Sequence, residues 1–410
     1  MTRISLLRRC CAGWACALLL TLAACDNPSS AGLDLIGEDG GVPVAVIEPA
    51  VVVVPDTLSE VTGGFAAVAN PTAARVLAGE ARDPLFGTVT TDAFLDFVRP
   101  TSVPDGFTES TPSRLVLELP IDYVYGDSAA VTRFDVYEIP ADWEPVGARP
   151  DTTFIDFATT TPFASFDLGR SDTTATFELP SAWITEKGET LTSDTFESAF
   201  HGFVLRASGD GEGYTGPGGV RGFDAPSIRL AVTVADTTIR YAANEVFTRI
   251  AWDDAPSRTD DLAVARDGAQ ESISVEFDYG TNVRQRPLSS AEFRLKLDEM
   301  LTDMPVNGVE FVRPRPEALD LFGTNPDAEP GDNPLVRIGR LGYDNELGEY
   351  RFSSVALTNA MQDELLGSVQ FERFVVRLVS TPAAVSVLPI FGPSLTDQTP
   401  RFEFIVTDSN

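Results

Sequence analysis

The sequence predicts an all-β protein with a few short helices, in which two related β-sandwich domains follow a signal peptide and a flexible tether. Three observations predict this class. Short runs rich in Val, Ile, Thr, Phe and Leu alternate with turn residues along the chain. The 410 residues include 32 glycines and 29 prolines, and few segments have a long helical period. Similar strand patterns also recur in the same order at an offset of about 170 to 180 residues.

Residues 1–24 have the layout of a secretory signal peptide. Arg3, Arg8 and Arg9 precede an almost wholly apolar run from Cys10 to Ala24. This run is shorter than the roughly twenty residues that a helix needs to span a bilayer. We therefore expect the segment to be removed rather than to remain as a membrane-spanning helix.

The apolar run ends in Leu22-Ala23-Ala24-Cys25, which resembles a bacterial lipoprotein signal. In such signals, cleavage before the cysteine leaves it as the lipidated first residue, so Cys25 is the predicted lipid anchor. The other three cysteines lie within the first 16 residues, a distribution that excludes a disulfide framework. The alternative is an ordinary signal peptide in which Cys25 is a coincidence.

Residues 25–41 are rich in Gly, Ser, Asp and Pro and are predicted to form a lipid-anchored tether. Several acyl chains on one residue hold a protein firmly to a membrane. We expect the outer membrane as the location, because the acidic Asp26 stands directly beside the anchor. Both faces of that membrane, periplasmic and cell-surface, stay open.

The chain is strongly acidic. Without the three arginines of the signal it keeps 27 basic and 61 acidic residues, a formal net charge of −34. Such a surface repels nucleic acid and anionic head groups, so no nucleic-acid partner is expected. Lysine occurs only at Lys187 and Lys296. The acidity indicates a salt-adapted, solvated surface, and acidic patches that hold divalent cations are the alternative.

The first domain is assigned to residues 42–238. Its expected strands are residues 44–54, 87–98, 114–125, 132–139, 175–180, 202–208 and 227–234. The segment PSAWITEKG, residues 180–188, is the expected short helix between them.

The second domain, residues 239–410, is predicted to be a weaker repeat of the first. The matched pairs are 93–97 with 273–277, 112–119 with 290–297, 200–208 with 371–380, and 225–234 with 399–406. Residues 353–367 place Val355, Leu357, Met361 and Leu365 near helical spacing, which predicts a helix. Residues 289–300 contain a capping-box pattern, but their partner in the repeat alternates like a strand, so a strand is expected there.

Several of these segments resemble the DNRLRE-type domain, a jelly-roll β-sandwich of secreted and surface proteins related to carbohydrate-binding modules. Val136-Tyr137-Glu138-Ile139 with Trp143 matches its "vyxvxxxW" segment, Gly202 to Leu205 its "GFxLxxx" strand, and Pro226 to Val232 its closing strand. The resemblance implies jelly-roll topology and a carbohydrate or polymer ligand. The second domain lacks a counterpart of the "vyxvxxxW" segment.

The leading part of the chain is similar to an uncharacterised family of Bacteroidota-type lipoproteins. That family carries a Gly-x-x-x-Asp-Pro-x-Phe-Gly signature, which here is Gly79, Asp83, Pro84, Phe86 and Gly87. The similarity implies a lipid-anchored envelope protein. It implies no activity, because none is assigned to the family.

The residues of the mature chain give little support to catalysis. His201 is the only histidine, it begins a strand-like segment, and no cysteine lies beyond the anchor. Cys/His nucleophiles, zinc sites with several His or Cys ligands, and a Ser-His-Asp triad are therefore not expected. No nucleotide-binding loop is present. A carboxylate pair that hydrolyses glycosides is a remote alternative. With 61 acidic residues in the chain, the sequence does not single out any one pair.

Residues 208–226 form a Gly-rich connector between two expected strands. Asp210 and Glu212 are hard oxygen ligands of the kind that calcium takes, and Tyr214 can stack on a sugar ring. The alternative is a solvated connector whose glycines permit tight turns. The acidic run 327–333 is a weaker calcium candidate without EF-hand spacing.

Trp143, Trp183 and Trp252 are the tryptophans of the mature chain. Each can pack in a core or present a ring to a glycan. Trp143 is the best candidate for ligand binding, because it follows a strand and precedes a Pro-containing loop.

The function expected from these observations is a lipid-anchored, non-catalytic binding module at the cell envelope, with a glycan or another extracellular polymer as its ligand. The alternative is a structural or assembly lipoprotein that contacts an envelope protein. No cofactor is expected other than the calcium just considered, and the oligomeric state stays open.

Overall fold

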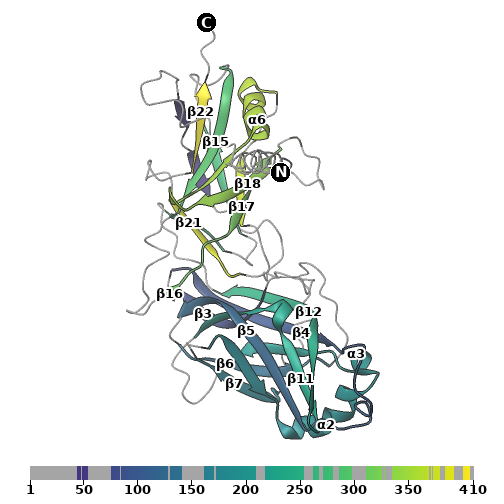
Figure 1. The fold of residues 1–410 in the computed structure, drawn as a ribbon. Helices are drawn as coiled ribbons and strands as arrows, with labels where there is room; N and C mark the ends of the chain where they lie inside the picture. Colours follow the sequence, from purple (N-terminus) through teal and green to yellow (C-terminus); the bar gives the residue numbers. More distant parts are fainter. Residues whose placement is uncertain are drawn as a thin grey trace, which may run out of the picture.

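The structure is a computed structural model, and it places the elements of two β-rich units end to end (Figure 1). It describes residues 44–47, 49–53, 75–83, 85–127, 130–140, 161–169, 172–208, 218–253, 262–266, 271–279, 286–297, 311–325, 327, 335–368, 371, 373–378, 384–391 and 400–406. Every strand pairing among these residues is antiparallel, which confirms the predicted all-β class. Within the same residues, no helix is long and apolar enough to cross a membrane.

The first unit is built on an eleven-stranded sheet, to which it supplies ten strands and the second unit supplies β16 (Phe311–Val312). Its elements are β3 (Arg75–Asp83), β4 (Gly87–Val98), β5 (Arg114–Asp127), β6 (Thr132–Glu138), β7 (Ala164–Leu168), β8 (Thr174–Glu178), α2 (Ser181–Thr192), α3 (Phe196–Ala199), β9 (Phe203–Ala207), β10 (Gly219–Asp224), the 3-10 helix η2 (Ala225–Ser227), β11 (Arg229–Val234) and β12 (Thr237–Asp253). The sheet order is β12-β11-β5-β10-β3-β4-β9-β6-β7, and β12 returns to pair with β4. The strands β12, β11, β5, β10, β3 and β4 therefore form a closed circuit.

The second unit is built on a nine-stranded sheet and a two-stranded ribbon. Its elements are β1 (Val44–Ile47), β2 (Pro49–Val53), β13 (Leu262–Arg266), β14 (Ser272–Phe277), β15 (Leu288–Lys296), β17 (Ala318–Thr324), β18 (Leu335–Asp344), β19 (Glu349–Ser353), α6 (Val355–Leu366), β20 (Phe374–Leu378), β21 (Val387–Phe391) and β22 (Arg401–Val406). The sheet order is β1-β22-β15-β19-β18-β17-β20-β14-β2, and β13 pairs with β21. The short strand β16 (Phe311–Val312) crosses to the first unit and pairs with β5.

The two units repeat the same pairings in the same chain order. The pairs β3·β10, β4·β9, β5·β11, β5·β8, β6·β7 and β6·β9 of the first unit correspond to β13·β21, β14·β20, β15·β22, β15·β19, β17·β18 and β17·β20 of the second. The helix also falls at the same place, since α2 follows β8 and α6 follows β19. All four sequence matches lie on corresponding strands.

The domain boundaries differ from the predicted ones at both ends of the first unit. Strands β1 and β2, expected in the first domain, pair with β22 and β14 of the second unit. Strand β12 continues to Asp253, beyond the predicted boundary at 238, because its second half pairs with β4. A strand can pair with residues far away in the sequence, and a local pattern of apolar residues does not determine which strand that is.

Period-two alternation explains why residues 288–296 form strand β15 rather than a helix. Ala291, Phe293 and Leu295 point into the core and are fully buried. Glu292 and Arg294 point to the other face, where each pairs with charged groups on neighbouring strands. A helix would scatter these two sets around its axis, whereas a strand separates them cleanly.

Helix α6 confirms the helix predicted for residues 353–367. Leu357, Met361 and Leu365 form its buried face. The Ser354 hydroxyl accepts a hydrogen bond from the Leu357 backbone N–H at the N-terminus. The helix ends at Gly367, whose φ of 74° suits a glycine C-cap. In the first unit α2 likewise buries Trp183, Ile184 and Leu191, as expected for the segment from 180.

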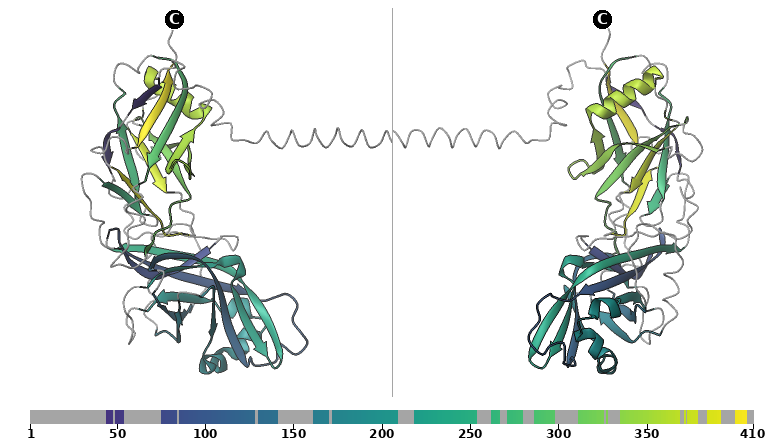
Figure 2. Two further views of the ribbon diagram at one scale, coloured as in Figure 1. Left: turned by 60° about the vertical axis from the view of Figure 1, so that its left-hand side comes forward. Right: turned by 90° about the vertical axis from the view of Figure 1, so that its right-hand side faces the viewer.

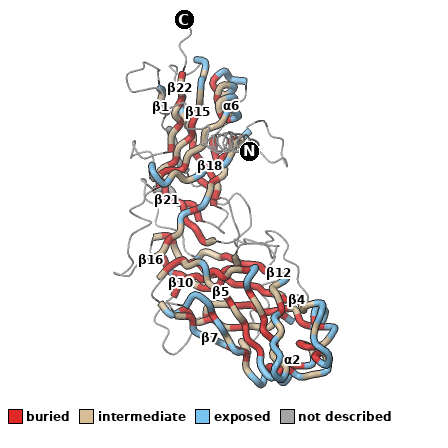
Figure 3. Tube along the Cα trace, in the orientation of Figure 1, coloured by how far each residue is buried: buried red, intermediate tan, exposed pale blue. Residues whose placement is uncertain are grey.

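Each unit has its own core, as the buried stretches along the strands show (Figure 3). Phe134, Phe203 and Phe223 lie at the centre of the first core. Phe293, Phe374 and Phe402 lie in the second core. The Phe402 ring makes edge-to-face contacts with the other two rings, with centroids 5.0 Å apart in each pair. The two further views show the units stacked along one long axis, with α2 and α6 toward opposite ends of the molecule (Figure 2).

Three buried tyrosines predict that stability falls at alkaline pH. Burial raises the pKa of Tyr125 well above its usual value, and raises that of Tyr241 and Tyr350 in the same direction. Their contribution to stability is complete below the unfolded-state pKa of about 10 and is lost as the pH rises beyond it. The melting temperature should therefore decline from about pH 10 upward, together with tyrosinate absorbance that appears on unfolding.

The Tyr241→Phe variant provides the control for this prediction. It removes one of the titrating hydroxyls, together with the hydrogen bond from Tyr241 Oη to the Leu191 carbonyl at 2.8 Å. Its melting temperature should start lower and decline less steeply with pH. Tyrosinate absorbance from all tyrosines in the still folded protein would contradict the prediction.

Candidate functional site

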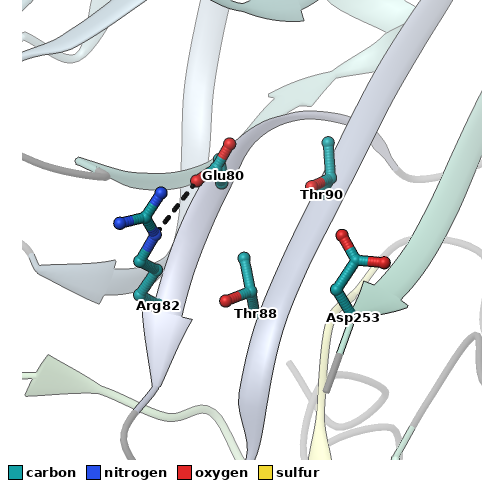
Figure 4. A pocket seen from close by; sticks show the side chains of 5 residues that line it. All are labelled: Glu80, Arg82, Thr88, Thr90 and Asp253. Atoms are coloured by element: carbon teal, nitrogen blue, oxygen red, sulfur yellow. Dashed lines mark ion pairs between the residues drawn. The ribbon is translucent and has the colours of Figure 1, made fainter. Parts of the chain in front are cut away.

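The candidate site is a polar groove on the first unit, shown in Figure 4. It is a shallow, open groove with a volume of about 430 Å³, lined by Glu80, Arg82, Thr88, Thr90 and Asp253. These side chains come from three neighbouring strands, β3, β4 and β12. All five of these described lining residues are polar or charged, so the groove is suited to a hydrophilic ligand.

Strand register fixes the layout of the groove. Glu80 lies opposite Thr90 and Arg82 lies opposite Thr88 in the β3·β4 pair. Asp253 lies opposite Thr88 on the other side of β4. Residues two apart on a strand share a face. Thr88 and Thr90 of β4 therefore form the floor of the groove, with Glu80 and Arg82 of β3 on one side and Asp253 of β12 on the other.

The groove offers both donors and acceptors of hydrogen bonds. Arg82 Nε lies 3.5 Å from a Glu80 carboxylate oxygen, and the Arg82 side chain is 68% exposed against 22% for Glu80. The guanidinium and the hydroxyls can donate, and the hydroxyls and two carboxylates can accept. Paired carboxylate, guanidinium and hydroxyl groups are the partners that sugar hydroxyls need.

The opposite face of the same three strands forms the joint between the units. Successive side chains on a strand point to opposite faces, so Asp83, Val89 and Trp252 lie behind Arg82, Thr88 and Asp253. Val89 and Trp252 pack in a cluster that includes Phe311 and Val385 of the second unit. The groove and the joint are therefore the two faces of one part of the sheet.

A fully buried ion pair lies at the centre of the joint. Arg313 of the second unit contacts Asp83 at 2.5 Å, and both side chains are 0% exposed. Tyr125 donates a hydrogen bond to the same carboxylate at 3.1 Å. The Arg313 guanidinium also lies over the rings of Phe311 and Phe86, 4.4 and 5.7 Å from their centroids. These contacts compensate the buried charges, which is the condition for such a pair to persist.

A second arginine of the C-terminal unit holds the same region. Arg266 makes an ion pair with Glu271 at 2.7 Å and donates a hydrogen bond to the Phe86 carbonyl at 3.2 Å. Its guanidinium lies 5.1 Å from the centre of the Trp252 ring. Trp252 is thus a joint residue rather than an exposed platform.

The joint gives physical roles to four residues of the Gly-x-x-x-Asp-Pro-x-Phe-Gly signature. Asp83 holds Arg313, and Phe86 is fully buried beneath the two arginines. Gly79 has a φ of 137°, and a Cβ there would lie 2.4 Å from the Gly219 carbonyl oxygen. Gly87 has a φ of 94°, which favours glycine at the turn into β4. Pro84 lies outside the described residues.

Most of the site residues predicted from the sequence lie outside the described part of the chain. They are the anchor Cys25, the ligand-binding candidates Trp143 and Tyr214, and the calcium candidates Asp210 and Glu212. Of the acidic run 327–333, only Asp327 is described, and it is exposed. Among the described residues, no group of three or more His, Cys, Asp or Glu side chains is placed to hold a metal ion.

Trp183 and His201, both considered from the sequence, lie within the described residues. Trp183 is 7% exposed, stacks on Phe163 with ring centroids 4.8 Å apart, and donates a hydrogen bond to Glu138 at 3.1 Å. It therefore belongs to the core. His201 is half-buried and precedes β9.

Sequence reasoning missed the groove. Glu80 with Arg82 and Thr88 with Thr90 do show the polar alternation of a solvent-facing strand, and both pairs flank the Asp83 signature. The missing information was the partner of these strands. Asp253 stands more than 160 positions further along the chain and reaches the groove only through the β4·β12 register.

A second buried cluster of charges is occupied by its own arginines. Asp92 is 1% exposed and lies 2.6 Å from Arg249 and 3.1 Å from Arg206. Burial raises its pKa, and the two guanidinium groups oppose that effect. Because both partners contact the same carboxylate oxygen, this cluster ties β4 to β9 and β12.

Comparisons with known proteins give no family assignment. No family model matches the chain, and no curated protein matches it. Among solved structures, a chain from the structure of the Macrobrachium rosenbergii nodavirus aligns at 11% identity over 85% of this chain and 90% of that chain. Its TM-score is 0.13, so this likeness carries no argument about fold or function.

The buried joint predicts a large loss of stability in Arg313→Ala. The variant leaves the Asp83 carboxylate buried without its partner, a change that costs about 3–5 kcal/mol. Denaturant unfolding should therefore give a lower free energy of unfolding, or an earlier separate transition.

Arg337→Ala is the matched control, because Arg337 forms an exposed ion pair with Asp320 at 2.8 Å. Its loss should cost less than about 1 kcal/mol. Equal losses in the two variants would show that the Asp83–Arg313 pair does not hold the joint.

Proposed function

We propose that the protein is a lipid-anchored binding module of the cell envelope, whose first unit holds a hydroxyl-rich polymer such as a glycan. The observation that carries the proposal is the polar groove of Glu80, Arg82, Thr88, Thr90 and Asp253. The residues that carry its donors and acceptors stand on paired strands, so the spacing of their backbone positions is set before a ligand arrives. Preorganised polar groups lose little conformational entropy on binding.

The sequence supplies the support for the anchor and the location. The segment from Leu22 to Cys25 resembles a lipoprotein signal, and the following polar residues suit a tether to the outer membrane. The resemblance to DNRLRE-type and Bacteroidota-type lipoprotein sequences adds support for a surface protein with a carbohydrate ligand. The antiparallel units with repeated pairings are compatible with a jelly-roll binding module.

A structural or assembly role is the second candidate, and the joint favours it. The Asp83–Arg313 pair, Phe86 and Trp252 fix the two units to each other through buried contacts. A fixed joint suits a spacer that must hold a partner at a set position. Crosslinking in cells that recovers one envelope protein at stoichiometric yield, without glycan binding, would favour this role.

The groove predicts glycan binding that depends on two side chains. The soluble protein without its anchor is titrated against a panel of neutral polysaccharides, with and without calcium. Asp253→Asn should weaken binding roughly tenfold or more, because a hydrogen bond to a charged group contributes about 1.5–3 kcal/mol. Thr90→Val should weaken it about twofold to tenfold, because a hydrogen bond between neutral groups contributes about 0.5–1.5 kcal/mol.

Matched controls lie at the start of strand β12 and in the turn just before it. Thr237→Val and Asp236→Asn make the same changes at exposed positions away from the groove. Both should bind as the unchanged protein does. Absence of binding across the panel would overturn the proposed function, and equal losses in the controls would overturn the assignment of the groove.

The anchor predicts loss of membrane attachment in Cys25→Ser. The variant cannot be acylated, so it should leave the detergent-rich phase on phase separation and lose metabolic labelling with a fatty-acid analogue. Attachment by several acyl chains is far stronger than the marginal binding of one. A Cys25→Ser protein that stays firmly membrane-bound would contradict the prediction.

A further inference from the structure

The segment that follows the predicted tether belongs to the unit that is last in the chain. In β1, Val44 lies opposite Ile405 and Ile47 lies opposite Phe402 of β22. In β2, Val51 lies opposite Glu276 of β14. The chain then enters the first unit at β3, so strands β1 and β2 are paired across more than 200 sequence positions.

This segment has the same place in the second unit that β12 has in the first. Strand β12 pairs first with β11 and then with β4. Residues 44–53 pair first with β22 and then with β14, which correspond to β11 and β4. The first unit therefore carries its closing strand within itself, and the second unit receives it from the N-terminal part of the chain.

Side-chain packing agrees with a built-in strand. Ala45 and Ile47 pack against the second core. Val44 and Val46 point outward and are 57% and 51% exposed. This alternation fixes the register, because a slip by one residue would exchange the buried and exposed pairs.

The segment enters the second unit at the end remote from the first unit. Val44 lies opposite Ile405, near the end of β22. Figures 1 and 2 both show this end of β22 pointing away from the first unit. The chain runs from there through β1 and β2 before it reaches β3.

We infer that residues 44–53 are a strap that holds the C-terminal unit at the membrane and presents the first unit, with its groove, away from it. The inference rests on the proposed lipid anchor at Cys25. Eighteen residues separate that cysteine from Val44. A chain of that length reaches at most about 60 Å when fully extended. The partner of the C-terminal unit is therefore the lipid surface itself.

The orientation is tested by energy transfer on vesicles that carry the lipidated protein. A donor dye is placed on Val355→Cys in α6 or on Ala182→Cys in α2, two exposed positions at the starts of corresponding helices. Acceptors are head-group-labelled lipids in neutral phosphatidylcholine. The acylated Cys25 does not react with the dye.

Transfer from position 355 should exceed transfer from position 182 about twofold or more, because the chain from the anchor enters the C-terminal unit, which carries α6, at its end remote from the first unit, which carries α2. Equal transfer, or greater transfer from position 182, would overturn the inference. Co-flotation of protein with the vesicles reports the anchor separately. Loss of flotation would refute the proposed anchor, whereas flotation with the wrong ranking would refute only the strap.

A disulfide trap tests the strap without any membrane. The soluble protein that starts after Cys25 contains no cysteine, so Val44→Cys with Ile405→Cys introduces one directly opposed pair. Oxidation should give a monomer with an internal disulfide and a raised melting temperature. The control, Val44→Cys with Val336→Cys, places the second cysteine on β18 and should not close. A reduced monomer, or a disulfide-linked dimer, from the first pair would overturn the strap.

Discussion

Both units depend on a closing strand that joins two edges of a folded sheet. An unpaired edge exposes a row of backbone donors and acceptors, and it invites pairing with another chain. In the first unit β12 covers the edges of β11 and β4. In the second unit β1 and β2 cover β22 and β14. The need to satisfy these edges explains why the N-terminal segment lies on the C-terminal unit.

The alternation of side chains along three strands connects the groove to the joint. Arg82, Thr88 and Asp253 face the groove. Their neighbours along the strands, Asp83, Val89 and Trp252, face the joint. Any shift of these strands therefore moves the side chains of the groove and those of the joint together. The buried Asp83–Arg313 pair resists such movement, because separating the two charges would leave each without compensation. This back-to-back arrangement gives the groove a rigid support.

Local patterns predicted the elements better than their partners. Helix α6 followed from the helical spacing of its apolar residues, a signal that lies within a few residues. The strand over residues 288–296 followed from the internal repeat, because its own capping-box pattern favoured a helix. The pairing of β1 with β22 and of β2 with β14 was not predictable, because alternation along a strand says nothing about which distant strand it joins. The groove was missed for the same reason, as Asp253 reaches it through the β12 register alone. Arg313 pairs with the signature residue Asp83, and nothing in the sequence around Arg313 indicated this pairing.

The different sources of the closing strand imply different dependence on the rest of the chain. The β11–β12 hairpin closes within a few residues, since Val234 lies opposite Thr237, so the entropy of bringing these strands together is small. The second unit must bring Val44 to Ile405 across most of the sequence. The first unit can therefore complete its sheet from its own residues, whereas the second does so only after the N-terminal segment has docked. Docking of β1 and β2 and completion of the C-terminal sheet are thus one physical event.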